Sequence, residues 1–231
     1  MTSNQGGGMT NIIALIPARS GSKGIHKKNI MNFKGKPLIA HSINYAQKCP
    51  LIGDIIVSTD SNEFSNIANQ YGARTPFLRP KELSGDDVED FPVVSHALKF
   101  LENEENKKID YIALLRPTSP LRPINLIEKA FDLININELA SSVRTVVPSR
   151  QHPYRQFRIH NGRMISYCDD VREPYNIPRQ KLPKTYFQSG DLEFIRRSTI
   201  LKGSVSGDFI VPLFLNEADL FDIDLPEDLK Q

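Results

Sequence analysis

The sequence has few cysteines and no long apolar run. Its 231 residues include only two cysteines, Cys49 and Cys168, without CxxC spacing. This pattern favours neither a zinc site nor a disulfide framework, and it fits a reducing cytoplasm. No apolar stretch approaches the roughly 20 residues that span a bilayer. We therefore expect a cytoplasmic protein with no membrane partner.

Neither basic nor acidic residues are in large excess. The 29 basic and 27 acidic residues leave a formal net charge of +2, which gives no support to general nucleic-acid binding through a strongly basic face. Neither Gly-x-x-x-x-Gly-Lys-Ser/Thr nor Gly-x-Gly-x-x-Gly occurs. The sequence therefore argues against nucleic-acid partners and against ATP hydrolysis by the standard P-loop route.

Apolar runs alternate with helix-period segments from residue 11 to 148. This order is typical of crossover units on a parallel sheet. We predict an α/β fold with a Rossmann-like, mostly parallel sheet flanked by helices, and ligand sites at the carboxyl ends of the strands. The expected strands are 12–17, 54–59, 76–78, 110–115 and 140–147, and the expected helices are 37–48, 62–71, 90–102 and 123–136. In the last helix, Pro123 should take the first position and Ile124 the buried face.

The character of the chain changes after Pro148. Residues 149–183 are rich in proline, arginine and aromatic side chains, and Asn161-Gly162 between apolar positions predicts a type I′ hairpin. We interpret this segment as an inserted dimerisation arm and assign residues 11–148 and 184–231 to the α/β core. Residues 1–10 are expected to form a disordered leader.

A basic, glycine-containing turn follows the first predicted strand. Gly21 and Gly24 permit positive φ values, which let backbone N–H groups surround an anion. Such a turn can bind a triphosphate, although a solvated basic turn is the alternative. The cations within this turn are Arg19, Lys23, Lys27 and Lys28.

Two further motifs carry candidate ligands. Asp222-Ile223-Asp224 puts two carboxylates on one face of an extended segment, which suits Mg²⁺ together with phosphate oxygens; two surface aspartates are the alternative. Arg116-Pro117-Thr118-Ser119 combines guanidinium and hydroxyl groups in a turn that proline makes rigid. Thr118 and Ser119 can also cap a helix.

Together these motifs identify a family, because the chain resembles the acylneuraminate cytidylyltransferases from about Ile12 to Leu229. The resemblance implies transfer of CMP from CTP to the anomeric 2-hydroxyl of a nine-carbon 2-keto sugar acid, with release of pyrophosphate. It also implies a homodimer that uses Mg²⁺. The matching motifs are Ala18-Arg19-Ser20-Gly21-Ser22-Lys23-Gly24 with Lys28-Asn29, Ile56-Val57-Ser58-Thr59-Asp60, Arg79-Pro80-x-x-Leu83, Leu115-Arg116-Pro117-Thr118-Ser119-Pro120-Leu121-Arg122, Pro178-Arg179-Gln180-x-Leu182-Pro183 and Asp222-Ile223-Asp224.

The resemblance further implies roles for single residues. Lys23 is the first choice for stabilising the negative charge that develops during phosphoryl transfer. Asp222 and Asp224 are expected to hold Mg²⁺ and, with Arg19 and Lys23, to form the catalytic group. The expected nucleotide contacts are Ala18, Ser22, Lys28, Asn29 and Arg79. The expected sugar contacts are Arg116, Thr118, Ser119, Gln188 and Glu193, together with Arg155 and Arg179 at the subunit interface.

The sugar half departs from the family pattern. Members that act on N-acetylneuraminate often have Gln in place of Arg116 and an aromatic residue in place of Glu193, which favours a legionaminic-type or related bacterial acid here. The acidic residues 86–90 replace small hydroxyl residues on the cytidine side. Two alternatives stay open: a same-fold nucleotidyltransferase for another nucleotide or sugar acid, such as an eight-carbon one, and a catalytically idle nucleotide- or sugar-binding module.

Overall fold

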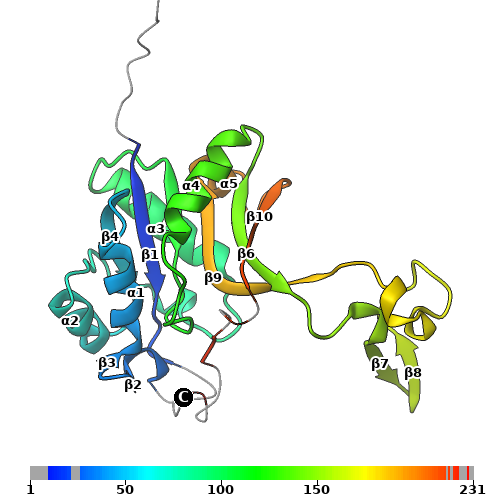
Figure 1. Ribbon diagram of the computed structural model, residues 1–231. Coiled ribbons are helices and arrows are strands. Elements are labelled where there is room, and N and C mark those ends of the chain that lie inside the picture. Colours follow the sequence, from blue (N-terminus) through cyan, green and yellow to red (C-terminus); the bar gives the residue numbers. More distant parts are fainter. Residues whose placement is uncertain (1–9, 22–26, 217, 219–220, 224–227, 229–231) are drawn as a thin grey trace, which may run out of the picture.

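A six-stranded sheet forms the centre of the protein (Figure 1). In this computed structural model, residues 10–21, 27–216, 218, 221–223 and 228 are described. The strands are β1 (Ile12–Pro17), β4 (Ile52–Ser58), β5 (Tyr111–Leu114), β6 (Ser142–Pro148), β9 (Tyr186–Arg196) and β10 (Ile210–Phe214). Their order is β10-β6-β9-β5-β1-β4, and only the pairings that involve β9 are antiparallel within this sheet. The predicted mostly parallel α/β fold is confirmed.

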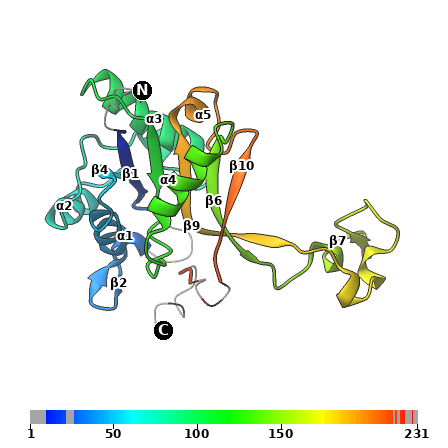
Figure 2. The ribbon, with the colours of Figure 1, turned by 45° about the horizontal axis from the view of Figure 1, so that its top comes forward.

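Helices cover both faces of this sheet (Figure 2). They are α1 (Leu38–Gln47), α2 (Asn62–Gln70), α3 (Asp90–Asn103), α4 (Leu126–Ile136) and α5 (Arg197–Leu201). On β1, Ile12, Ala14 and Ile16 belong to the cluster with α1 and α4, whereas Ile13 and Leu15 belong to the cluster with α3. Burial on both faces explains why the strand is an unbroken apolar run.

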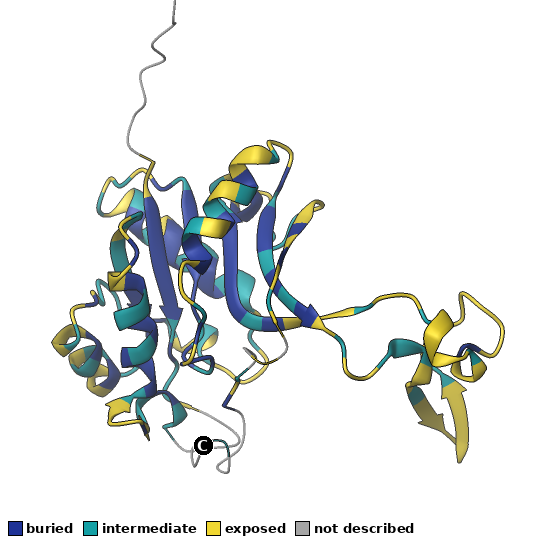
Figure 3. Cartoon of the chain, in the orientation of Figure 1, coloured by how far each residue is buried: buried dark blue, intermediate teal, exposed yellow. Residues whose placement is uncertain are grey.

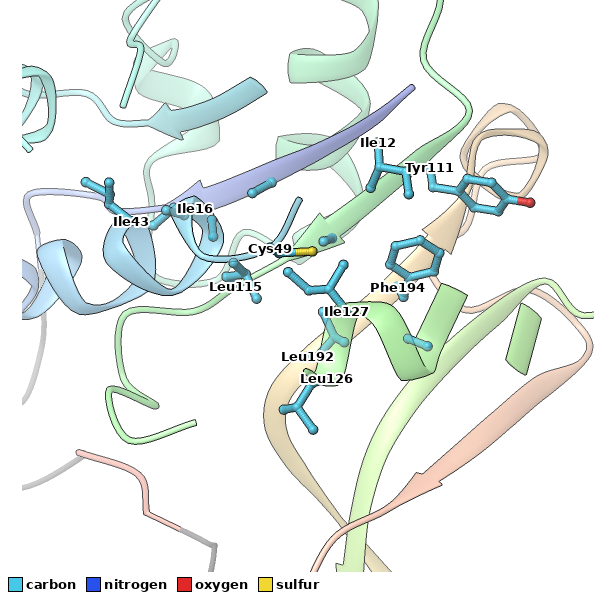
Figure 4. Close-up of a cluster of buried hydrophobic side chains, with 14 of the residues drawn as sticks. Ile12, Ile16, Ile43, Cys49, Tyr111, Leu115, Leu126, Ile127, Leu192 and Phe194 are labelled. Atoms are coloured by element: carbon cyan, nitrogen blue, oxygen red, sulfur yellow. The ribbon is translucent and has the colours of Figure 1, made fainter. Parts of the chain in front are cut away.

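The larger of these clusters joins β5 to β9 (Figure 4). The ring of Phe194 stacks on that of Tyr111, with centroids 5.1 Å apart. Cys49 is buried in the same cluster. Because large aromatic side chains bury much apolar area, this pair contributes strongly to holding the antiparallel strand in place.

Two expected elements differ from the structure. Residues 76–78 form no strand, because Pro76 cannot donate to a ladder. The region makes isolated bridges, from Arg74 to Ile56 of β4 and from Leu78 to Thr59 just after β4. The helix expected from Pro123 begins at Leu126, since Asn125 adopts a left-handed conformation and the hydroxyl of Tyr45 accepts the Leu126 N–H.

The same local geometry leaves Ile124 exposed rather than on a buried helix face. Asn125 stops the helical backbone from continuing toward it. Of the expected leader, residues 1–9 lie outside the described residues, so this prediction stays untested.

Residues 149–185, here called the arm, leave the sheet between β6 and β9 and extend away from it (Figure 3). The arm carries the hairpin of β7 (Phe157–His160) and β8 (Arg163–Ser166). Asn161 and Gly162 both have positive φ, as the predicted type I′ turn requires. The burial colours in Figure 3 show that the hairpin is largely exposed.

Short elements complete the described fold. A small hairpin pairs β2 (Asn32–Phe33) with β3 (Lys36–Pro37), and 3₁₀ turns lie at η1 (Lys28–Ile30), η2 (Lys81–Leu83), η3 (Pro153–Arg155), η4 (Pro174–Asn176) and η5 (Arg179–Lys181). Among the described residues, no helix has the length and apolar character needed to cross a membrane.

Candidate active site

The loops after β1 and β5 and residues 79–93, which lead from α2 into α3, enclose a pocket of about 240 Å³ at the carboxyl edge of the sheet. This is where parallel α/β sheets place their ligands. Ser22, Lys23 and Asp224, which were expected near it, lie outside the described residues. The expected site residues that line the pocket are Arg19, Lys28, Asn29, Arg79, Arg116 and Thr118.

The backbone of the first loop is fixed by its neighbours. The N–H of Ala18 donates to the Ser58 carbonyl over 2.9 Å. The amide of Asn29 donates to the Arg19 carbonyl over 3.0 Å, and the backbone and hydroxyl of Ser20 both donate to the Asp60 carboxylate. These bonds hold the start of the basic loop against the end of β4.

Arg79 braces the same strand end while it lines the pocket. Its Nε donates to the Ser58 hydroxyl over 3.0 Å and its Nη2 to the Ser58 carbonyl over 2.5 Å. Burial lowers the pKa of Arg79 to about 10, although the nearby Asp60 carboxylate opposes this shift. The guanidinium therefore stays charged at neutral pH and gives the pocket wall a fixed cation.

Arg116 belongs to a network of ion pairs. Its Nη2 lies 2.5 Å from Asp90 Oδ2 and 2.6 Å from Glu193 Oε1. The other oxygen of Glu193 lies 2.8 Å from Arg144 Nη2, which also donates to the Ser206 hydroxyl. Burial alone lowers the pKa of Arg116, but the two carboxylates outweigh it and raise this pKa. Glu193 is only 1% exposed, so it contributes to the pocket through Arg116.

A bulge in β9 creates this network. Residues 189–192 lie opposite the single residue Thr145 of β6, and Gly190 supplies a positive φ at the turn. Gln188 and Glu193, on either side of the bulge, become neighbours, and the Gln188 amide donates to Glu193 Oε1 over 3.1 Å. Bulges commonly redirect side chains beside functional sites.

Arg122 holds this bulge against the pocket loop. Its guanidinium donates to the carbonyl oxygens of Asp191 and Arg116 and to the Ser42 hydroxyl. Burial lowers the pKa of Arg122 to about 10. The hydroxyl of Ser119 and Oδ2 of Asp191 are buried close by without a hydrogen-bond partner among the described residues.

The acidic motif near the end of the chain lies against the pocket wall. Ile223 is buried with Phe33 and Leu38, and its N–H donates to the Thr118 carbonyl over 2.8 Å. Asp222, the preceding residue, is exposed. The described part of the chain holds no group of three or more potential metal-binding side chains, and Asp224 is not among its residues.

Arg155 and Arg179 lie apart from this pocket. They line a cavity of about 660 Å³ where the arm joins the sheet, and Arg155 donates to the Ile177 carbonyl over 3.0 Å. Figure 1 shows that the arm starts at the carboxyl end of β6 and extends sideways, away from the other strands. Within one chain, these two residues are therefore not brought together with Arg116.

Sequence reasoning did not single out several of these residues. Arg144 is the one that the sequence indicates most clearly, because a charged residue inside an apolar strand needs a buried partner. Arg122 stands in a quoted motif, but its bonds to two distant carbonyl oxygens required the fold. Asp86 and Asp90 look like a solvated acidic run in the sequence, although each pairs with a pocket arginine.

A mostly parallel sheet with basic loops at its carboxyl edge is typical of α/β proteins that bind anionic ligands at that edge. The chain belongs to the Cytidylyltransferase family, whose sequence model matches residues 13–177.

Individual relatives support this assignment. The chain is 32% identical to a pseudaminic acid cytidylyltransferase of Campylobacter jejuni over 94% of this chain and 93% of the relative. It is 34% identical to a Campylobacter jejuni CMP-N,N'-diacetyllegionaminic acid synthase, over 96% and 93%. An Escherichia coli N-acylneuraminate cytidylyltransferase is 40% identical over 72% of this chain and 38% of its own length.

The fold also has solved counterparts. The structure of a CMP:2-keto-3-deoxy-manno-octonic acid synthetase complexed with CTP superposes with a TM-score of 0.71, covering 96% of both chains at 14% identity. At this identity the likeness concerns the fold alone.

Proposed function

We propose that this protein is a CMP-nonulosonate synthetase, which transfers CMP from CTP to the anomeric 2-hydroxyl of a nine-carbon 2-keto sugar acid. The observation that carries this proposal is the pocket at the carboxyl edge, where Arg19, Lys28, Arg79 and Arg116 lie together. The names of the relatives, which act on pseudaminic, legionaminic or acylneuraminic acids, support the acceptor class. A cytoplasmic location, favoured by two free cysteines, is part of the proposal.

The reaction joins the 2-hydroxyl oxygen of the sugar acid to the α-phosphorus of CTP. The bond from this phosphorus to the leaving pyrophosphate breaks, and the hydroxyl proton is released. Negative charge grows on the leaving oxygens, so fixed cations aimed at them lower the barrier. We assign this stabilisation to Arg19 and Lys23, with Ala18, Ser22, Lys28 and Asn29 placing the phosphates and Arg79 supporting the cytidine side.

Asp222 and Asp224 are the residues that would hold Mg²⁺. Carboxylate oxygens are the hard ligands that Mg²⁺ prefers. Asp222 is exposed and directly precedes the buried Ile223, whose N–H donates to the carbonyl of the pocket residue Thr118. The donor set therefore fits the ion. When bound, Mg²⁺ neutralises phosphate charge.

The acceptor side is assigned to Arg116, Thr118, Ser119 and Gln188, with the buried Glu193 positioning Arg116. The ion pairs of Arg116 favour an acid other than N-acetylneuraminate, of the legionaminic or a related type. Two relatives named for pseudaminic and diacetyllegionaminic acids support this choice.

A homodimer completes the proposal. Ile159, Met164 and Tyr167 on the arm are 69%, 65% and 69% exposed, and exposed apolar groups of this size commonly mark protein contacts. Arg155 and Arg179 point to the same arrangement, because they can serve a sugar site only if the arm reaches the partner subunit.

The decisive experiment measures pyrophosphate release with Mg²⁺ across CTP, UTP, GTP and ATP, combined with N-acetylneuraminic, legionaminic, pseudaminic and eight-carbon 2-keto acids. We expect release with CTP and a nine-carbon acid. Asp224→Asn should abolish turnover without altering the circular dichroism spectrum. Absence of pyrophosphate for every pair would refute the enzyme assignment.

Mixing variants tests the role of the arm. Arg179→Ala and Arg116→Gln should each lose activity, and co-refolded mixtures should regain part of it, since one site in a mixed dimer then carries neither substitution. A mixture no more active than its components would exclude a shared site.

A further inference from the structure

A short acidic segment, residues 84–90, closes one side of the candidate active site. It connects η2 to α3, and Gly85, Val88 and Asp90 line the pocket together with Arg19 and Arg116. The resemblance to the family accounts for the arginines but gives these carboxylates no role.

Two carboxylates of this segment hold the two arginines. Asp86 forms an ion pair with Nη1 of Arg19, the residue assigned to the phosphates. Asp90 Oδ2 lies 2.5 Å from Nη2 of Arg116, the residue assigned to the acceptor. Arg19 and Arg116, two of the cations proposed to receive a substrate anion, therefore each have a carboxylate partner in this segment.

The two arginines are supported differently on their inner sides. Glu193 is buried, and its Oε1 lies 2.6 Å from Arg116 Nη2. The Arg116 guanidinium therefore stays in place when Asp90 moves away. Nη1 of Arg116 is buried without a hydrogen-bond partner among the described residues. The Asp90 side chain is 41% exposed and the Asp86 side chain 33% exposed, so both can move into solvent.

We propose that Asp86 and Asp90 are internal counter-ions that set substrate affinity: the triphosphate displaces Asp86 from Arg19, and the carboxylate of the acceptor displaces Asp90 from Arg116. The identities of the two anions rest on the proposed function. The carboxylate of each pair is partly exposed. An ion pair that is open to solvent contributes about 0.2–1 kcal/mol, and a ligand that breaks it loses that amount. Removing either charge should therefore strengthen binding of one anion about 1.4- to 5-fold.

The experiment uses two matched neutral variants, Asp86→Asn and Asp90→Asn, in the full-length protein. Calorimetry gives the Kd of inorganic tripolyphosphate and of CTP, and steady-state assays give the KM of the acid that the enzyme turns over. Glu89→Gln is the control, because it removes the same charge from the same segment and Glu89 is exposed.

We expect Asp86→Asn to lower the Kd of tripolyphosphate and CTP by about 1.4- to 5-fold without changing the KM of the acid. Asp90→Asn should lower the KM of the acid by a similar factor and leave tripolyphosphate binding unchanged. An unchanged or weaker affinity in either variant, or an equal effect of Glu89→Gln, would overturn the proposal. Tripolyphosphate binding does not depend on turnover, so its result stands even if the pyrophosphate assay refutes the proposed function.

Discussion

Replacing Glu193 by glutamine tests whether the buried ion pairs stabilise the fold. Glu193 is 1% exposed, and its two oxygens lie 2.6 Å from Arg116 and 2.8 Å from Arg144. Removal of the negative charge takes from Arg116 and Arg144 the carboxylate that they share, while Arg116 keeps its ion pair with the partly exposed Asp90. Breaking a buried pair costs about 3–5 kcal/mol. Because the arginine side chains are 24% and 17% exposed, water screens part of this loss, and we expect about 2–4 kcal/mol.

Urea denaturation followed by circular dichroism measures this loss. For a domain of this size it corresponds to a fall in Tm of roughly 4–16 °C. Glu138→Gln, at an exposed position, is the control and should change stability by less than about 0.5 kcal/mol. In a double-mutant cycle with Arg144→Gln, the two losses should add to more than the loss of the double variant. A Glu193→Gln variant as stable as the control would refute the assumption that the pairs are formed and desolvated.

Two further predictions concern single sites. Burial raises the pKa of the Cys49 thiol to about 11. At pH 8 this thiol should therefore react with Ellman's reagent only after unfolding, whereas the partly exposed Cys168 should react in the native protein. Rapid labelling of both thiols in the native protein would contradict the burial of Cys49. A Cβ at Gly207 would lie 2.3 Å from Cβ of Ser141 at a positive φ, whereas Gly203, also at positive φ, has no described atom within 4 Å of its Cβ position. Gly207→Ala should therefore lower the free energy of unfolding by about 1–3 kcal/mol more than Gly203→Ala in urea denaturation. Equal losses in the two variants would show that Ser141 moves aside without a loss of stability.

The layered fold was predictable because its signals are local. The apolar run at 12–17 is buried on both faces, and the 3.6-residue spacing in α1 follows one buried stripe. The failures at 76–78 and at Pro123 were also local in origin, because Pro76 and the left-handed Asn125 interrupt patterns that their neighbours support. Hydrophobic periodicity indicates which side chains are buried. It does not indicate whether the backbone N–H groups of a segment find hydrogen-bond acceptors.

The candidate site divides into a predictable and an unpredictable half for a related reason. The carboxyl ends of parallel strands meet at one edge, so strand assignments alone bring Arg19 and Arg116 to a common pocket. The partners of Arg116 lie 26 and 77 positions away in the sequence, and no period or spacing connects them.

The contact between Arg116 and Glu193 depends on β9 running antiparallel between β5 and β6 and on the bulge that sets Gln188 beside Glu193. Either feature could change without altering the basic loop at Arg19. Under the proposed assignment of residues, such a pocket retains its nucleotide half while residues of β9 alter its acceptor half. For this reason the substitutions most informative about the sugar acid lie on β6 and β9, at Arg144, Gln188 and Glu193, rather than in the glycine-containing turn.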